Sequence, residues 1–120
     1  MLKSYIELDV WIEARKLVNQ VYTLTNEFPK EELYSITNQI RRSSVSIPSN
    51  IAEGCGRQST KETIRFLYIS RGSLYELETQ LYLSNDQQFI SNELLKTILN
   101  QVEICKKLIN GFIKYYKSKI

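Results

Sequence analysis

The clearest helical pattern in the sequence is Phe66-Leu-Tyr-Ile-Ser-Arg-Gly-Ser-Leu-Tyr-Glu-Leu-Glu-Thr-Gln-Leu-Tyr-Leu-Ser84. This stretch, residues 66–84, indicates the fold because the pattern is unbroken. Apolar and small residues recur there at spacings of three and four: Leu67, Ser70, Leu74, Leu77, Leu81 and Ser84. An α-helix repeats about every 3.6 residues, so these positions share one face. Just upstream, Ser59 and Glu62 have the spacing of a capping box. The pattern predicts a long amphipathic helix over about residues 60–84.

The same spacing recurs on both sides of this segment. It predicts further helices over about residues 9–25, 32–54 and 92–117, and no part of the chain alternates as a β-strand does. The connections between these segments are short, which makes successive helices antiparallel neighbours. We therefore predict an all-α fold, an antiparallel up-down-up-down four-helix bundle that forms a single domain over residues 1–120.

The residues at the expected helix ends agree with this interpretation. Asp9 is a candidate N-cap of the first helix and Ser91 of the last, because their side-chain oxygens can accept a free backbone amide. Gly54 and Gly56 can end the second helix, since glycine readily adopts the left-handed conformation after a helix.

Two residues interrupt the helical patterns. Pro48 lies within the second predicted helix, where it should produce a kink, tolerated by the packing or used to shape a surface. Gly72 lies in the middle of the third, where glycine costs about 1 kcal/mol relative to alanine. We interpret Gly72 as a position where another helix approaches closely.

The composition argues against catalysis. The chain has 120 residues, no histidine and two cysteines, so it lacks the commonest general base and metal ligand. Cys55 lies near Arg57, which could lower the pKa of its thiol, but no histidine can activate it. Cys105 lies on a predicted core stripe, and two cysteines alone do not build a zinc site. We predict no catalytic residue, no metal site and no cofactor, and hence no enzyme.

Neither a signal peptide nor a membrane helix is predicted. The acidic Glu7 follows the N-terminus closely, and no run approaches the roughly 18 apolar residues of a membrane span. Two isolated cysteines are typical of reduced thiols. We expect a cytoplasmic protein with no membrane partner.

The formal net charge of +3 hides a segregated distribution. Residues 41–75 hold six bases and two acids, and residues 104–120 hold five lysines and no acid. Basic faces of this kind can bind phosphate. The candidate nucleic-acid-binding residues are Arg41, Arg42, Arg57, Lys61, Arg65, Arg71, Lys106 and Lys107, with Lys114 and Lys117 beside them. The alternatives are solvated helix faces or, for Arg42 and Arg71, ion pairs with Glu53 or Glu76 at a subunit boundary.

Three tyrosines recur every seven residues, each one position after a leucine of the predicted core. A lone bundle would leave them partly exposed, and tyrosine and tryptophan are enriched in protein interfaces. We predict a homo-oligomer whose interface includes Trp11, Tyr68, Gly72, Tyr75 and Tyr82. A wider core, or stacking of the tyrosines on nucleobases, is the alternative.

Several segments together resemble one known family. They are Val10-Trp11, Val21-Tyr22, Phe28-Pro29, Gln39-Ile-Arg-Arg-Ser-Ser-Val-Ser-Ile-Pro-Ser-Asn-Ile-Ala-Glu-Gly54, Phe66-Leu67 and Gly72-Ser-Leu-Tyr-Glu-Leu-Glu-Thr-Gln-Leu81. The sequence resembles the bacterial "four helix bundle protein" family, also called 23S ribosomal RNA intervening-sequence proteins. The resemblance covers nearly the whole chain, although the last stretch matches only in helical character.

The resemblance implies a four-helix bundle that assembles into a ring-like homopentamer and has no established enzymatic activity. Some members are encoded inside insertions in large-subunit ribosomal RNA genes. The chain is also similar to accessory proteins of diversity-generating retroelements, which are basic pentameric bundles that bind nucleic acid and a reverse transcriptase. Two functional hypotheses follow: a non-enzymatic oligomer that binds RNA or other nucleic acid, and an oligomeric scaffold for a protein partner with no nucleic-acid role.

Overall fold

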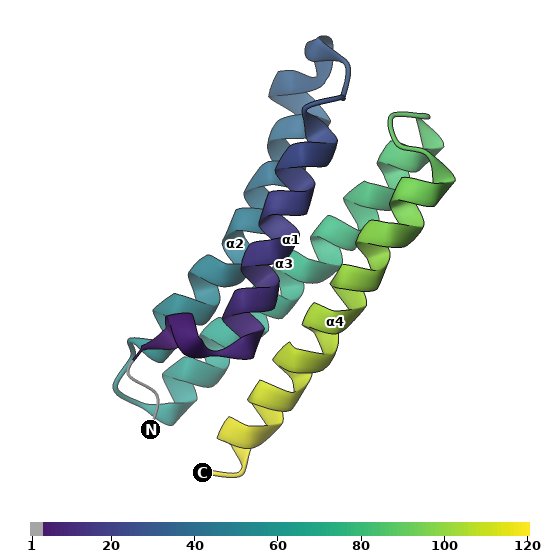
Figure 1. Cartoon of the computed structure of the whole chain (residues 1–120). Coiled ribbons are helices and arrows are strands. Elements are labelled where there is room, and N and C mark those ends of the chain that lie inside the picture. Colours follow the sequence, from purple (N-terminus) through teal and green to yellow (C-terminus); the bar gives the residue numbers. More distant parts are fainter. Residues whose placement is uncertain (1–3) are drawn as a thin grey trace.

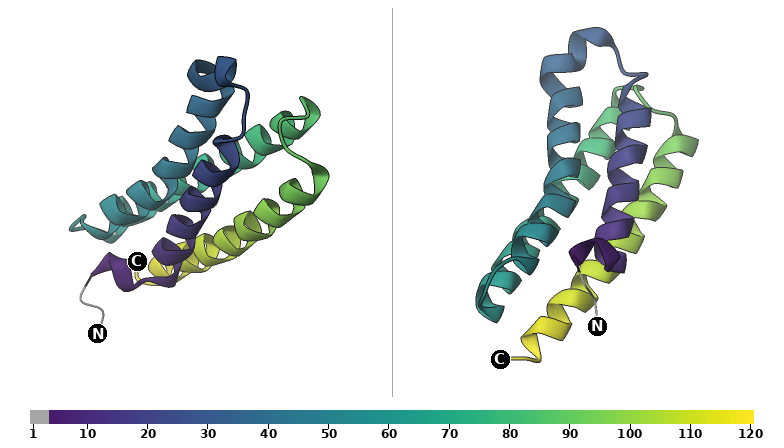
Figure 2. Two further views of the ribbon diagram at one scale, coloured as in Figure 1. Left: turned by 45° about the horizontal axis from the view of Figure 1, so that its top comes forward. Right: turned by 60° about the vertical axis from the view of Figure 1, so that its left-hand side comes forward.

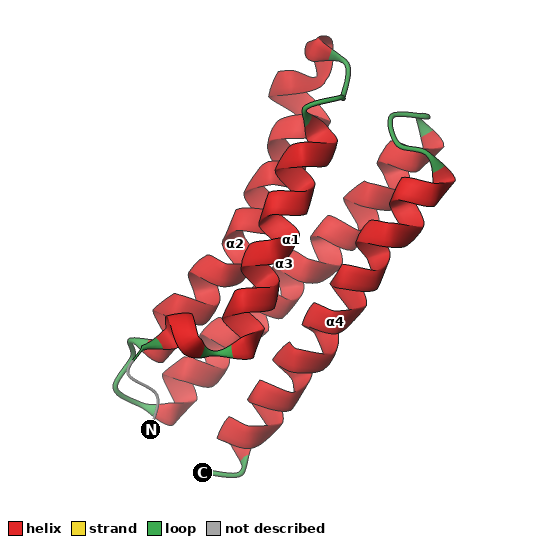
Figure 3. Ribbon diagram, in the orientation of Figure 1, coloured by secondary structure: helices red, strands yellow, loops and turns green. Residues whose placement is uncertain are grey.

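The computed structural model of the chain describes residues 4–120. Within that range it contains four long helices and no strand: α1 (Asp9–Thr25), α2 (Asn38–Cys55), α3 (Thr60–Asp86) and α4 (Asn92–Lys117). They lie side by side in an elongated body of 45 × 25 × 22 Å (Figures 1 and 3). The prediction of an all-α fold with four helices is confirmed.

The helices pack in the order of the sequence. α1 packs against α2, α2 against α3, and α3 against α4, while α4 also packs against α1. The α3–α4 turn lies at one end of the molecule, and the α2–α3 turn and the end of α4 lie at the other (Figure 2). Residues after α2 and residues at the end of α4, far apart in the sequence, therefore share one end of the bundle.

The predicted apolar stripes form the core. Leu17 of α1, Ile47 of α2, Leu74 of α3 and Ile109 of α4 are all fully buried in one hydrophobic cluster. Small polar residues fill the contact between α2 and α3. Among them Ser70 is fully buried, and its hydroxyl donates a 2.8 Å hydrogen bond to the carbonyl oxygen of Ile47. A serine on the apolar stripe is thus satisfied by the neighbouring helix backbone.

Two of the three predicted helix caps are confirmed. The hydroxyl of Ser59 accepts the amide of Glu62 at 3.1 Å, and the hydroxyl of Ser91 accepts the amide of Leu94 at 3.1 Å. The prediction for Asp9 is wrong, because Leu8 occupies the N-cap position and no side chain caps the helix there. Asp9 lies instead in the first turn, where its negative charge suits the helix dipole.

The second helix begins later than its predicted start at about residue 32. Lys30–Glu32 form a 3-10 turn and Leu33–Thr37 a π-helical turn before α2. Ser35 breaks the helical conformation, with φ −125° and ψ −110°. Its hydroxyl donates to a carboxylate oxygen of Glu32 at 2.8 Å, so a local side-chain bond competes with the helix backbone. From Asn38, α2 continues through Pro48 to Cys55 as one helix.

The glycines do not have the conformations that the sequence predicted. Among the described residues no glycine has a positive φ, and Gly56 has φ −83°. Gly54 serves close packing instead, because a Cβ atom there would lie 3.1 Å from the Phe66 Cβ and 3.2 Å from the Thr63 carbonyl oxygen. Gly72 has no neighbour of this kind within 4 Å, so within one chain no helix approaches it.

Candidate nucleic-acid interface

Two of the predicted arginines meet on one aromatic ring at the α2–α3 turn. The guanidinium carbons of Arg57 and Arg65 each lie 4.6 Å from the centre of the Phe66 ring. Arg57 also pairs with Glu53 at 3.0 Å, and Arg65 with Glu62 at 3.1 Å. These contacts hold both guanidinium groups in place at the surface.

Close packing of the turn positions this cluster. The Thr63 hydroxyl donates a 2.8 Å hydrogen bond to the Gly54 carbonyl oxygen, which ties the start of α3 to the end of α2. Because Gly54 has no side chain, Phe66 lies directly against it. The ring that both arginines contact is therefore fixed by the backbone of both helices.

A second cluster joins α3 to the last turns of α4. Arg71 and Lys117 both lie over the Tyr68 ring, at 4.8 and 5.2 Å from its centre. Arg71 donates a further hydrogen bond of 3.1 Å to the side-chain oxygen of Asn110. Tyr68 is half-buried beneath these cations. The exposure of its side chain therefore does not support the prediction that it lies in an oligomer interface.

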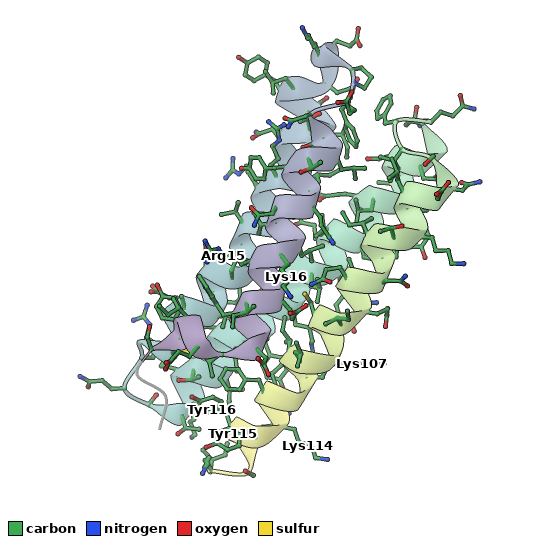
Figure 4. All side chains as sticks on the ribbon, viewed as in Figure 1. Arg15, Lys16, Lys107, Lys114, Tyr115 and Tyr116 are labelled. Atoms are coloured by element: carbon green, nitrogen blue, oxygen red, sulfur yellow. The ribbon has the colours of Figure 1, made fainter. Side chains whose placement is uncertain are left out.

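We define the basic end of the molecule by the bases that the structure gathers there: Arg57, Lys61, Arg65, Arg71, Lys114, Lys117 and Lys119. Lys61 and Lys114 are exposed and carry no ion pair within 4.0 Å among the described residues. Lys107 and Lys114 point outward from α4 in Figure 4. At the opposite end, the α3–α4 turn region carries acids such as Asp86 and Glu93.

Lys106 does not belong to this surface. Its ammonium group lies 2.7 Å from Glu78 and 3.0 Å from Glu103, and its side chain is mostly buried. Burial by itself would lower the pKa of Lys106, but the hydrogen bonds and charges of the two carboxylates outweigh it and raise the pKa. Lys106 thus ties α4 to α3 and is neutralised, whereas its neighbour Lys107 is exposed.

Arg41 and Arg42 lie away from the basic end, near the start of α2. Arg41 donates to the Thr25 hydroxyl at 2.9 Å and to the Asn26 side-chain oxygen at 3.1 Å. Arg41 lies fourteen residues before the last residue of α2, which corresponds to about 21 Å, and Arg57 follows beyond the end of the helix. The predicted bases therefore form separate groups, and Arg41 is already engaged by its own chain.

The outer face of α3 carries the exposed part of the tyrosine stripe. Tyr75 is 46% exposed and Tyr82 50% exposed, and Ile69 and Leu83 add apolar surface beside them. Gly72 is exposed on the same helix. Of the other predicted interface residues, Trp11 packs half-buried against the core and lies 5.5 Å from the Tyr5 ring.

Burial acts against thiolate formation at both cysteines. Burial raises the pKa of the half-buried Cys55 thiol. Burial, with a smaller effect of the Glu13 charge, raises the pKa of Cys105 to about 12. Residues 4–120 contain no cluster of metal-ligating side chains, and none of their helices is long and apolar enough to span a membrane.

Sequence reasoning missed the aromatic partners of the bases. Phe66 appeared only in a segment that carries the family resemblance, yet two arginines lie on its ring. Tyr115 and Tyr116 were also not considered as partners of the bases. The alternation Lys114-Tyr115-Tyr116-Lys117 is the signal that could have identified them, since aromatic residues among bases are typical of single-strand binding surfaces.

Comparison with known proteins identifies a family that matches the sequence and a solved structure with a similar fold. The family described as "23S rRNA-intervening sequence protein" matches residues 6–111. A crystal structure of a protein of unknown function from the S23 ribosomal protein family of Bacteroides thetaiotaomicron is similar, with a TM-score of 0.81 and 27% identity. The similarity covers 88% of this chain and 95% of that one. No curated protein matches the sequence.

Proposed function

Because the chain belongs to the 23S rRNA-intervening sequence protein family, we propose that it is a non-enzymatic, self-associating bundle that binds RNA through its basic end. The observation that carries the proposal is the concentration of bases there, several of them exposed. The three C-terminal members of the basic end, Lys114, Lys117 and Lys119, follow Glu103 with no further acid in the sequence.

The physical basis is phosphate neutralisation. Each lysine or arginine that contacts a phosphate releases bound counterions, which makes binding stronger at low salt. Arg57 and Arg65 each pair with a carboxylate at the surface. The exposed Lys61 and Lys114, which carry no ion pair within residues 4–120, are therefore the bases that neutralise phosphate in this proposal. An oligomer would repeat the basic end, so that several weak contacts act together.

The proposal includes an antiparallel, up-down-up-down bundle whose copies form a ring-like homo-oligomer, with five copies as the family resemblance implies. The exposed face of α3, with Tyr75, Tyr82, Ile69 and Leu83, supports self-association because soluble proteins seldom leave such apolar stripes uncovered. Gly72 supports it as well, since the absence of a side chain leaves room for a neighbouring subunit at that point.

Charge reversal at the two ends of the molecule tests the proposal. The double variant Lys61→Glu/Lys114→Glu changes two exposed bases at the basic end, and Lys30→Glu/Lys96→Glu is the matched control away from it. We expect the first variant to bind a structured RNA at least about tenfold more weakly than the second at the same ionic strength.

Equal RNA affinity of the two variants, with unchanged helical content, would contradict the proposal. Recovery of one stoichiometric protein partner by both variants, together with no RNA binding, would instead support the alternative of an oligomeric protein scaffold.

A further inference from the structure

An aromatic cavity opens at the basic end. It has a volume of about 520 Å³ and lies between the N-terminal turn, the end of α2 and the last turns of α4. The rings of Tyr5, Phe112, Tyr115 and Tyr116 line it, together with Leu8 and the Cys55 thiol. A volume of this size falls within the range of pockets that bind small organic groups.

The rings are fixed by contacts with one another. The centre of the Tyr116 ring lies 5.0 Å from that of Phe112 and 5.3 Å from that of Tyr115, both in edge-to-face arrangements. Tyr115 nevertheless remains 52% exposed. A rigid set of rings with an exposed member suits a flat, apolar group that can stack.

The charges around the cavity indicate which charge its ligand can carry. None of the residues that line it is acidic. The Lys119 ammonium lies 4.7 Å from the centre of the Tyr115 ring. In Figure 4 the Tyr115 and Tyr116 side chains lie on one side of the end of α4, and the Lys114 side chain points away on the other. Lys119 disfavours a cationic ligand and favours a flat ring that carries negative charge beside it.

We propose that this cavity binds an unpaired nucleobase of single-stranded RNA, while an adjoining phosphate contacts Lys119. The inference rests on the proposed RNA-binding function and names the kind of RNA. A base in a duplex is stacked between its neighbours and cannot enter a side pocket, whereas an unpaired base can stack on aromatic side chains.

The test compares three RNAs of one length by fluorescence anisotropy: a single strand, the same strand with abasic sites, and a blunt duplex. Tyr115→Leu removes the stacking ring, Tyr115→Phe keeps it, and Tyr34→Leu alters a tyrosine that is 92% exposed outside the cavity. We expect Tyr115→Leu to weaken binding of the single strand about 5- to 150-fold, with little change for the abasic strand or the duplex. Tyr115→Phe and Tyr34→Leu should bind like the unaltered protein.

Photocrosslinking gives an independent readout. A single strand that carries 5-iodouridine should crosslink to Tyr115 or Tyr116, as identified by mass spectrometry of the C-terminal peptides. Crosslinks confined to the α2–α3 turn would overturn the inference.

The outcomes separate this inference from the proposed function. If all three RNAs bind with equal, salt-dependent affinity and Tyr115→Leu changes nothing, the base site is refuted while RNA binding stands. If no RNA binds at low salt, both are refuted. If Tyr115→Leu dissociates the protein into monomers, the cavity is a contact between subunits and the base site is again refuted.

Discussion

Substituting alanine at Gly54 should destabilise the protein, although alanine is the better helix former. The added Cβ would lie 3.1 Å from the Phe66 Cβ and 3.2 Å from the Thr63 carbonyl oxygen, both tighter than ordinary van der Waals contact. Neither atom is the free end of a flexible side chain, so relief requires a shift of α3 itself. Thr63 resists that shift, because its hydroxyl is hydrogen-bonded to the Gly54 carbonyl oxygen.

The expected magnitude follows from two opposing effects. Overpacking at a site that cannot relax costs about 1–3 kcal/mol, and replacing glycine in a helix returns at most about 1 kcal/mol. Gly54→Ala should therefore lose between about 0 and 2.5 kcal/mol of unfolding free energy. Gly72→Ala is the matched control, because nothing lies within 4 Å of its added Cβ. It should gain about 0.5–1 kcal/mol from the helix effect alone.

Urea denaturation followed by circular dichroism measures both changes. The comparison is made over a range of protein concentrations, so that self-association is separated from the stability of the single chain. A Gly54→Ala protein that is as stable as Gly72→Ala would refute the close packing at the α2–α3 turn, and with it the explanation for how Phe66, whose ring Arg57 and Arg65 both contact, is held in place.

Three further outcomes are expected. Leu74→Ala should cost about 2–5 kcal/mol of unfolding free energy, because the leucine is fully buried in the core, and a loss below 1 kcal/mol in urea denaturation would contradict that. Burial raises the pKa of Cys105 to about 12 from 9.0. The buried neutral thiol therefore contributes fully to the free energy of unfolding below pH 9.0, and this contribution is lost as pH rises towards 12. Cys105→Ala should therefore make the alkaline fall in melting temperature shallower, and an unchanged fall would refute the assignment. Tyr75→Glu should dissociate oligomers measured by light scattering without loss of helical content, whereas Tyr34→Glu should not; equal masses for both would contradict an interface on α3.

The fold could be predicted from the spacing of apolar residues, because residues that are buried in a helix bundle must recur on one face of each helix. Leu67, Leu74 and Leu81 are all fully buried, as their spacing indicated. The serine caps at Ser59 and Ser91 were predictable for a similar reason, since a cap depends on residues within one turn. By contrast, the start of α2 depends on the bond from Ser35 to Glu32, which competes with a helix pattern that looks continuous in the sequence.

The candidate site was less predictable because charge alone does not reveal partners. Lys106 and Lys107 are adjacent and chemically identical, yet Glu78 of α3 buries and neutralises the first and leaves the second exposed. Arg41 was grouped with Arg57 by sequence, but it binds Thr25 and Asn26 near the other end of α2. Such contacts between distant segments appear only once the helices are packed.

The salt dependence of RNA binding tests the central claim most directly. The logarithm of the association constant for a single-stranded RNA should fall linearly with the logarithm of salt concentration. With about four phosphates neutralised, the slope is about −3, and Lys61→Glu/Lys114→Glu should make it shallower. A flat dependence, or no binding at low salt, would contradict the claim that the basic end of this bundle binds RNA.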